Sequence, residues 1–440
     1  AAETPEITTA SVIAVGDNLY HSKLYESGEY DSGNWNYDHI YANVLDEIQA
    51  ADVAMIDQET VFAPDHDSVS TYPSFATPQE VGDAIIKAGF DVVESATNHA
   101  DDYGYDYLKT TLDFWSSKYP TIPVLGIHST QEDADIVKVK EVNGIRIAFL
   151  DYTYGTNNSG AGEGHEYMID IFDKDKITTM IQKAKSICDC LIFVAHWGTE
   201  DETMPNEYEK QWAAFLMEQG VDVIIGGHPH VLQPYGRLSD DQGHSTLVFY
   251  SLGNFVSTQQ ELPELLEGMA SFTIQKTTLN GKSTIEILSP EVKPMVMHYN
   301  HDAGEYGPYM LSDSQHSVRN VIGDEFTLAN LQAKFKEIMS MNVKPSTNTN
   351  LLNVKFDWQG NMIDKTTGNV VEDTESIHSW EYLNSSGDTS DSSDTEDSSD
   401  TGDSSEADGD SYDGSYDESY DNSYDDGSYD NSYDDGSYDE

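Results

Sequence analysis

Length, composition and charge limit what this 440-residue chain can be. It is long enough for one large domain or two ordinary ones, each with a sizeable hydrophobic core. The formal net charge is −58 at pH 7, and removing the −21 contributed by residues 385–440 still leaves −37 on residues 1–384. An acidic surface of this size repels nucleic acid, so we expect no nucleic-acid partner. No apolar run reaches the roughly 18 residues of a membrane-spanning helix.

The first residues, Ala1–Pro5, are typical of a mature protein after signal-peptide cleavage, although an artificial start would look the same. We therefore expect a protein that is secreted or displayed on the cell surface, with its signal peptide removed.

Short apolar runs alternate with helical patterns over the first 280 residues, which predicts an α/β fold. Asn143-Gly144 and Asn280-Gly281 each predict a hairpin, so we expect the sheets to be mixed. Pro78 is expected to open a helix that Thr77 caps. The expected strands are 11–15, 53–56, 91–94, 124–126, 136–142, 145–150, 191–195, 221–225, 247–250, 268–275 and 283–288, and the expected helices are 37–50, 78–88, 105–116, 177–186, 207–219 and 328–339.

Three regions follow from this pattern. Residues 1–300 are expected to form the main domain, and residues 301–384 an extension that packs on it. Residues 385–440 are rich in Ser, Asp, Gly and Tyr, and Ser-Tyr-Asp recurs up to Tyr438. This composition predicts a disordered acidic tail, because it offers too little apolar surface to offset the entropy of ordering. A solubilising role is favoured over the binding of cations or a partner.

Polar residues follow five of the expected strands. Because ligands bind at the carboxyl ends of strands in α/β sheets, we expect these side chains to converge. Imidazole, carboxylate and amide groups suit divalent ions such as Mn, Fe and Zn, and two such ions can clamp both oxygens of a phosphoester displacement. The expected metal ligands are Asp17, Glu59, Asn98, His196, His228 and His230.

Each residue also has a simpler interpretation. Asp17 alone is more often a turn residue, Glu59 a solvated carboxylate, and His196 a core histidine. Their joint occurrence at successive strand ends favours the metal site. Glu59 is the expected bridging ligand, and His99 is expected to protonate the leaving group without binding metal. His21, Asp102 and Asn254 are further candidates for binding metal or for supporting its ligands.

These motifs resemble the bacterial capsule-synthesis CapA (PgsA) family over roughly residues 10–300. The matching segments are Gly16-Asp17 with His21 shortly after, Gln58-Glu59-Thr60, Asn98-His99-Ala100-x-Asp102-x-Gly104, His196-Trp197-Gly198, Gly227-His228-Pro229-His230 and Tyr250-Ser251-Leu252-Gly253-Asn254-Phe255.

The resemblance implies a calcineurin-like metallophosphoesterase fold, a four-layer αββα sandwich of two mixed sheets between helices. It also implies a role in poly-γ-glutamate capsule synthesis, with the capsule machinery as a partner. Asp17 and His230 would bind one ion, Glu59 would bridge, and Asn98, His196 and His228 would hold the second. Phosphoesterases usually have Asp-x-His at the first strand, whereas His21 lies four residues after Asp17, and Glu59 replaces the usual bridging Asp.

Three functions remain open from the sequence. The first is metal-dependent hydrolysis of a phosphoester substrate. The second is a non-catalytic accessory role, in which the metal site binds poly-γ-glutamate, an anionic polymer. The third is hydrolysis of an amide bond by the same ions.

Overall fold

The computed structural model describes residues 4–158, 160–300, 304–312, 326–356, 362–371 and 379–382. All of them belong to one unit, Ala1–Gly387. The tail at 385–440, for which disorder is predicted, lies outside the described residues.

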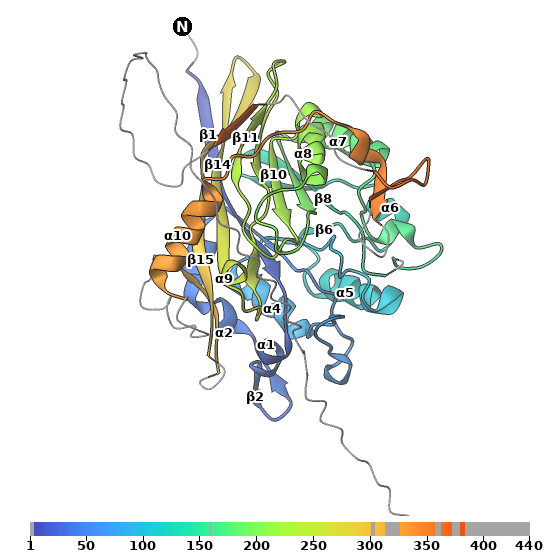
Figure 1. Ribbon diagram of the computed structural model, residues 1–440, viewed down its shortest axis with the longest axis vertical. Coiled ribbons are helices and arrows are strands. Elements are labelled where there is room, and N and C mark those ends of the chain that lie inside the picture. The colour runs from blue at the N-terminus through green and yellow to red at the C-terminus, as the bar shows by residue number, and fades with distance from the viewer. Residues whose placement is uncertain are drawn as a thin grey trace, which may run out of the picture. The chain divides into compact units, whose positions relative to one another are not determined.

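Two mixed sheets form the centre of the molecule (Figure 1). In the first sheet the strand order is β16-β15-β14-β1-β4-β5-β6, with β13 paired to β1, and in the second it is β19-β11-β12-β10-β9-β8-β7. The first sheet contains β1 (Glu6–Asn18), β4 (Val53–Asp57), β5 (Val92–Glu94), β6 (Val124–Leu125), β13 (Asn254–Val256), β14 (Leu266–Leu279), β15 (Lys282–Asn300) and β16 (Glu305–Met310), and the second contains β7 (Lys138–Val142), β8 (Ile145–Thr153), β9 (Cys190–His196), β10 (Val223–Gly227), β11 (Tyr235–Ser239), β12 (Ser245–Phe249) and β19 (Ser379–Tyr382).

Each sheet has a parallel half. Strands β1, β4, β5 and β6 run parallel in the first, and β8, β9, β10 and β12 in the second. Strand β1 is longer than the sequence predicts, because it pairs with β14 from Glu6↔Thr278 to Val15↔Met269. The carboxyl ends of the parallel strands are therefore where polar side chains can meet.

The apolar residues explain why the sheets stack. Val12 and Ala14 of β1 belong to the core between the sheets, whereas Ile13 and Val15 pack beneath helices on the outer face. A strand buried on both faces needs such a continuous apolar run. Each buried Val or Ile contributes roughly 1.5–3 kcal/mol to the stability of this stacking.

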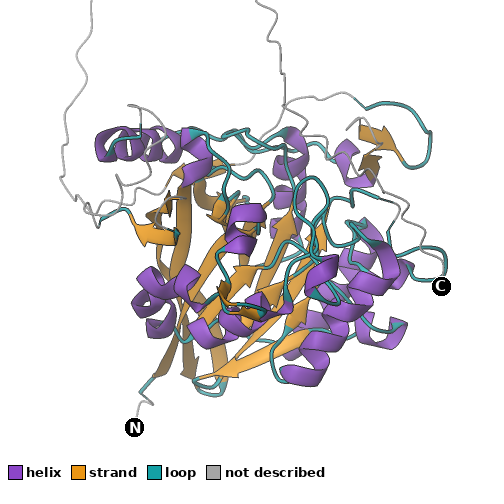
Figure 2. Cartoon of the chain, turned by 90° about the horizontal axis from the view of Figure 1, so that it is seen from below, coloured by secondary structure: helices purple, strands orange, loops and turns teal. Residues whose placement is uncertain are grey.

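Helices cover both outer faces, as Figure 2 shows with strands between helices. Helices α2 (Asp38–Tyr41), α3 (Leu45–Ala50), α4 (Gln79–Ala88) and α5 (Gly104–Lys118) pack on the first sheet, and α7 (Lys174–Ile187) and α8 (Glu207–Glu218) on the second. Helix α10 (Leu328–Met339) contributes to the core between the sheets. This arrangement confirms the predicted four-layer α/β sandwich.

The remaining elements are short. The expected helix 37–50 is divided into α2, the 3-10 turn η1 and α3. The expected cap of α4 is wrong: Pro78 is the N-cap residue, and the hydroxyl of Thr77 instead lies 2.5 Å from that of Thr60. The other elements are α1 (Ser22–Glu26), α6 (Gln131–Ala134), α9 (Leu262–Leu265), η1 (Ala42–Val44), η2 (His66–Ser68), η3 (Glu166–Met168), η4 (Asn350–Asn353), β2 (Glu29–Asp31), β3 (Asn34–Trp35), β17 (Val354–Phe356) and β18 (Met362–Asp364).

No described helix has the length and apolar character needed to cross a lipid bilayer.

Candidate metal centre

Asp17 and His230 form one end of the candidate site. Asp17 lies at the end of β1, opposite Asn254 of β13. Nδ1 of His230 is 3.0 Å from Oδ2 of Asp17 and 3.1 Å from Oδ1 of Asn254. The structure thus brings together two expected ligands, and it places Asn254 as a polar neighbour of His230.

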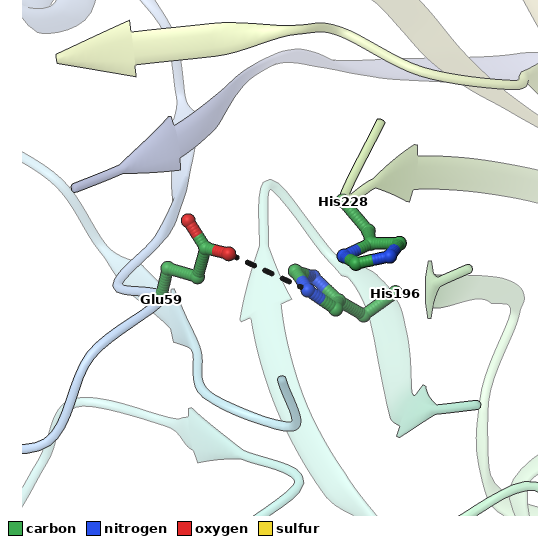
Figure 3. Close-up of side chains that lie close together, drawn as sticks. All are labelled: Glu59, His196 and His228. Carbon is green, nitrogen blue, oxygen red and sulfur yellow. Dashed lines mark ion pairs between the residues drawn. The ribbon is translucent and has the colours of Figure 1, made fainter. Parts of the chain in front are cut away.

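His196, His228 and Asn98 form the other end. The rings of His196 and His228 lie side by side with centroids 4.9 Å apart, and Figure 3 shows them beside Glu59. Nε2 of His196 is 2.8 Å from Oδ1 of Asn98 and 3.7 Å from Oε1 of Glu59.

Glu59 lies between these two ends. Its Oε1 atom is also 4.0 Å from Nε2 of His230. Two groups able to hold a metal ion share this carboxylate, namely Asp17–Glu59–His230 and Glu59–His196–His228. This is the place expected of a bridging ligand.

Asp57 also belongs to the site, although it was not among the predicted ligands. Asp57 is the last residue of β4. Its Oδ2 atom lies 3.2 Å from Nδ1 of His196, and Asp57 forms a third metal-capable group with Asp17 and His196. A carboxylate that holds one ring nitrogen of a histidine directs the other nitrogen toward a ligand position. A charged residue that ends the otherwise apolar run Val53–Ile56 was the available signal.

The buried oxygens of this cluster fit divalent cations. Asp17, Glu59, His196, His228 and His230 are each at most 3% exposed. Within the described part of the chain, neither carboxylate oxygen of Glu59 accepts a hydrogen bond, and Nδ1 of His228 has no partner. Burying unpartnered acceptors costs several kcal/mol, and coordination of a cation removes that cost. Hard oxygen and imidazole donors together suit ions of the Mn, Fe and Zn type.

The histidines differ in protonation. Burial lowers the pKa of His196 to about 4 and that of His228 well below its usual value, so both rings are neutral and can donate lone pairs. Burial also lowers the pKa of His230, but the carboxylates of Glu59 and Asp17 outweigh this and raise it to about 10. Burial raises the pKa of Glu59 to about 8.

The turn after β10 holds its two histidines in unusual backbone conformations. The φ angles of His228 and His230 are 96° and 60°, a region that favours glycine. Gly226 lets this turn approach its neighbour, because a Cβ there would lie 1.9 Å from the carbonyl oxygen of Tyr250. The sequence Gly-Gly-His-Pro-His therefore allows a close approach and aims both imidazoles into the site.

His99 forms a separate pair with Asp102. Nδ1 of His99 donates to Oδ2 of Asp102 at 2.6 Å, and the same oxygen accepts the backbone N–H of Phe75 at 2.6 Å. Neither residue belongs to a metal-capable group among the described residues. Asp102 therefore orients His99, which is available for proton transfer next to Asn98.

His21 lies at the border of the site. Its Nδ1 atom accepts the backbone N–H of Thr258 at 3.3 Å, and its ring packs edge-on against Phe75 with centroids 5.4 Å apart. Burial and the charge of His230 lower the pKa of His21 to about 4. One ring nitrogen is thus engaged by backbone, and the described metal-capable groups do not include this residue.

Fold and residues together define an α/β sandwich protein with a histidine- and carboxylate-rich metal-capable centre at the ends of its parallel strands. Residues 11–259 match the family described as bacterial capsule synthesis protein PGA_cap. The chain belongs to this family, which confirms the resemblance seen in the sequence.

Two curated relatives are similar to the chain. The PGA biosynthesis protein CapA of Bacillus subtilis (strain 168) is 29% identical over 297 residues, covering 65% of this chain and 74% of the relative. The capsule biosynthesis protein CapA of Bacillus anthracis is 30% identical over 185 residues, covering 41% of this chain and 43% of the relative.

Among solved structures, one similar chain is a Staphylococcus aureus protein provisionally described as a 5'-nucleotidase, in complex with alpha-ketoglutarate. The TM-score is 0.42 at 15% identity, covering 78% of this chain and 61% of the other.

Proposed function

We propose that this protein is a metal-dependent hydrolase of capsule biosynthesis that cleaves a phosphoester with two divalent ions. The observation that carries the proposal is the position of Glu59, whose two unpartnered oxygens lie between two sets of ligands. Bound ions of this kind polarise a phosphoryl oxygen and supply a hydroxide at neutral pH.

The residues of the chain divide into two roles in this proposal. Asp17, Glu59, Asn98, His196, His228 and His230 would hold the ions, with Asp57 orienting His196. The His99–Asp102 pair would provide a proton to the leaving oxygen, because Asp102 accepts from Nδ1 and leaves Nε2 for the substrate.

The His99–Asp102 pair also favours hydrolysis over simple binding of poly-γ-glutamate. A site that only holds polymer carboxylates through cations has no use for an oriented proton donor. Amide hydrolysis would use the same groups, and it therefore stays the second candidate. An extracellular location, expected from the sequence, remains a prediction.

The test is a substrate panel with protein of measured metal content. Wild-type protein loaded with Mn²⁺, Fe²⁺ or Zn²⁺ is assayed on aryl phosphate mono- and diesters and on poly-γ-glutamate. The proposal expects ester cleavage that a chelator abolishes and that Asn98→Ala removes. Metal-loaded protein that leaves every ester intact would overturn it, and release of glutamate from the polymer would establish the amide alternative.

A further inference from the structure

The segment that follows β8 is hydrogen-bonded to the segment that carries Asn98 and His99. The backbone N–H of Asn157 donates to the carbonyl oxygen of Asn98 at 2.9 Å. The side-chain amide of Asn158 donates to the carbonyl oxygens of Asp101 and Asp102, each at 3.2 Å. Asn157 is exposed, yet its side chain contacts buried groups of the site.

One end of the Asn157 amide contacts the side-chain amide of Asn98. A side-chain amide can bind a metal ion through its oxygen, but its NH₂ group only donates hydrogen bonds. Nδ2 of Asn98 donates to Oδ1 of Asn157 at 3.2 Å, and this bond turns Oδ1 of Asn98 toward Nε2 of His196, 2.8 Å away. If the amide of Asn98 flipped, its NH₂ group would face the ligands and Oδ1 would face Oδ1 of Asn157.

The other end of the same amide faces the proton-donating pair. Nδ2 of Asn157 donates to Oδ1 of Asp102 at 3.4 Å and lies 3.1 Å from Nδ1 of His99. Because Oδ2 of Asp102 already accepts from His99, the amide occupies the second carboxylate oxygen. The plane of this carboxylate, and with it the direction of the imidazole, is thereby fixed from both sides.

We infer that Asn157 is a positioning residue that sets, through its two amide ends, the metal-binding orientation of Asn98 and the alignment of His99 with Asp102. The first effect requires only that the centre binds metal. The second rests on the proposed function, because it concerns a proton donor for hydrolysis.

Metal affinity tests the first effect without any substrate. We would titrate the chelator-treated protein with Mn²⁺ and with Zn²⁺ against an indicator chelator, using wild type, Asn157→Ala, Asn157→Asp and the exposed control Asn34→Ala. Because Asn157→Ala removes the acceptor for Asn98, we expect the affinity for one of the bound ions to fall roughly 10- to 100-fold. Asn157→Asp keeps an acceptor for Asn98 and should bind both ions at least as tightly as wild type, and Asn34→Ala should match wild type.

Wild-type affinity for both ions in Asn157→Ala would overturn the inference, as would an equal loss in Asn157→Asp. If Asn157→Ala does not fold, a loss of metal affinity in the isosteric Asn157→Asp variant would still overturn the inference.

Kinetics test the second effect. Asn157→Asp lacks the donor to Asp102, so kcat on an aryl phosphate ester should fall at least tenfold while KM stays within about twofold. An unchanged kcat would refute this half of the inference. If wild type turns over no ester at all, the proposed function fails, whereas the affinity comparison still decides the role of Asn157 toward Asn98.

Discussion

Nδ1 of His230 lies 3.0 Å from Oδ2 of Asp17, and both side chains are at most 3% exposed. The pKa of His230 is raised to about 10, and the pKa of Glu59 to about 8, each the net of burial and neighbouring charges. The Glu59–His230 pair therefore holds at least one proton at pH 7 in the metal-free protein. Metal binding at this centre is therefore an exchange of protons for cations.

The first prediction is that metal affinity rises with pH. Below pH 8 metal binding should release at least one proton from this pair, so the apparent Kd should fall about tenfold per pH unit for each proton released. Calorimetric titrations at pH 6, 7 and 8, in buffers of different ionisation enthalpy, measure both the slope and the protons released. A flat pH dependence with no proton release would contradict this picture of the site.

The second prediction separates metal binding from proton donation. His99→Ala should retain both ions and lose about 10²- to 10⁴-fold in kcat, because general acid catalysis typically contributes that much. Elemental analysis and turnover of an aryl phosphate ester on the same sample check it. Loss of metal in His99→Ala would make His99 a ligand instead.

The third prediction concerns His21, whose Nδ1 atom already accepts the backbone N–H of Thr258. His21→Ala should keep the metal content of wild type, since the described metal-capable groups do not contain this residue. A drop to a single bound ion on elemental analysis would show that His21 is a ligand after all.

The fourth prediction compares two changes at Asp57. Asp57→Asn keeps an oxygen that can accept from Nδ1 of His196, whereas Asp57→Ala leaves that ring without its partner. Asp57→Ala should therefore weaken metal binding about 10- to 100-fold and Asp57→Asn much less. Chelator competition measures both, and equal losses would indicate that Asp57 itself binds a metal ion.

The fifth prediction concerns stability. A methyl group at Gly226 would collide with the carbonyl oxygen of Tyr250, so Gly226→Ala should lower the free energy of unfolding by about 1–3 kcal/mol or more. Gly155 has open space around a Cβ, and Gly155→Ala should change that free energy by less than about 0.5 kcal/mol. Urea denaturation of both variants provides the comparison, and equal stabilities would refute the close approach.

Sequence patterns predicted the strands that form the parallel halves of both sheets, and they predicted most residues of the candidate site. Asp17, His196 and His228 could be found because each lies one to three residues after a strong apolar run, and chain direction then brings strand ends together. Asp57 was not predicted because its charge marks the end of the apolar run Val53–Ile56 but does not show that it faces His196.

Strands whose existence depends on a distant partner were harder to predict. Strand β11 contains Gly236 and Arg237, yet it pairs with β12 and β19. Strand β13 is short and pairs with β1 only near Asp17 and Asn18. Such pairing is decided by tertiary context and not by local propensity.

The backbone at His228 and His230 has an evolutionary consequence. Non-glycine residues with positive φ cost on the order of 1 kcal/mol each or more, so glycine at either position would relieve strain while removing an imidazole from the centre. Selection for thermal resistance alone would favour that exchange. The stability lost to this strain can therefore be regained at these two positions only by removing a histidine from the metal-capable centre.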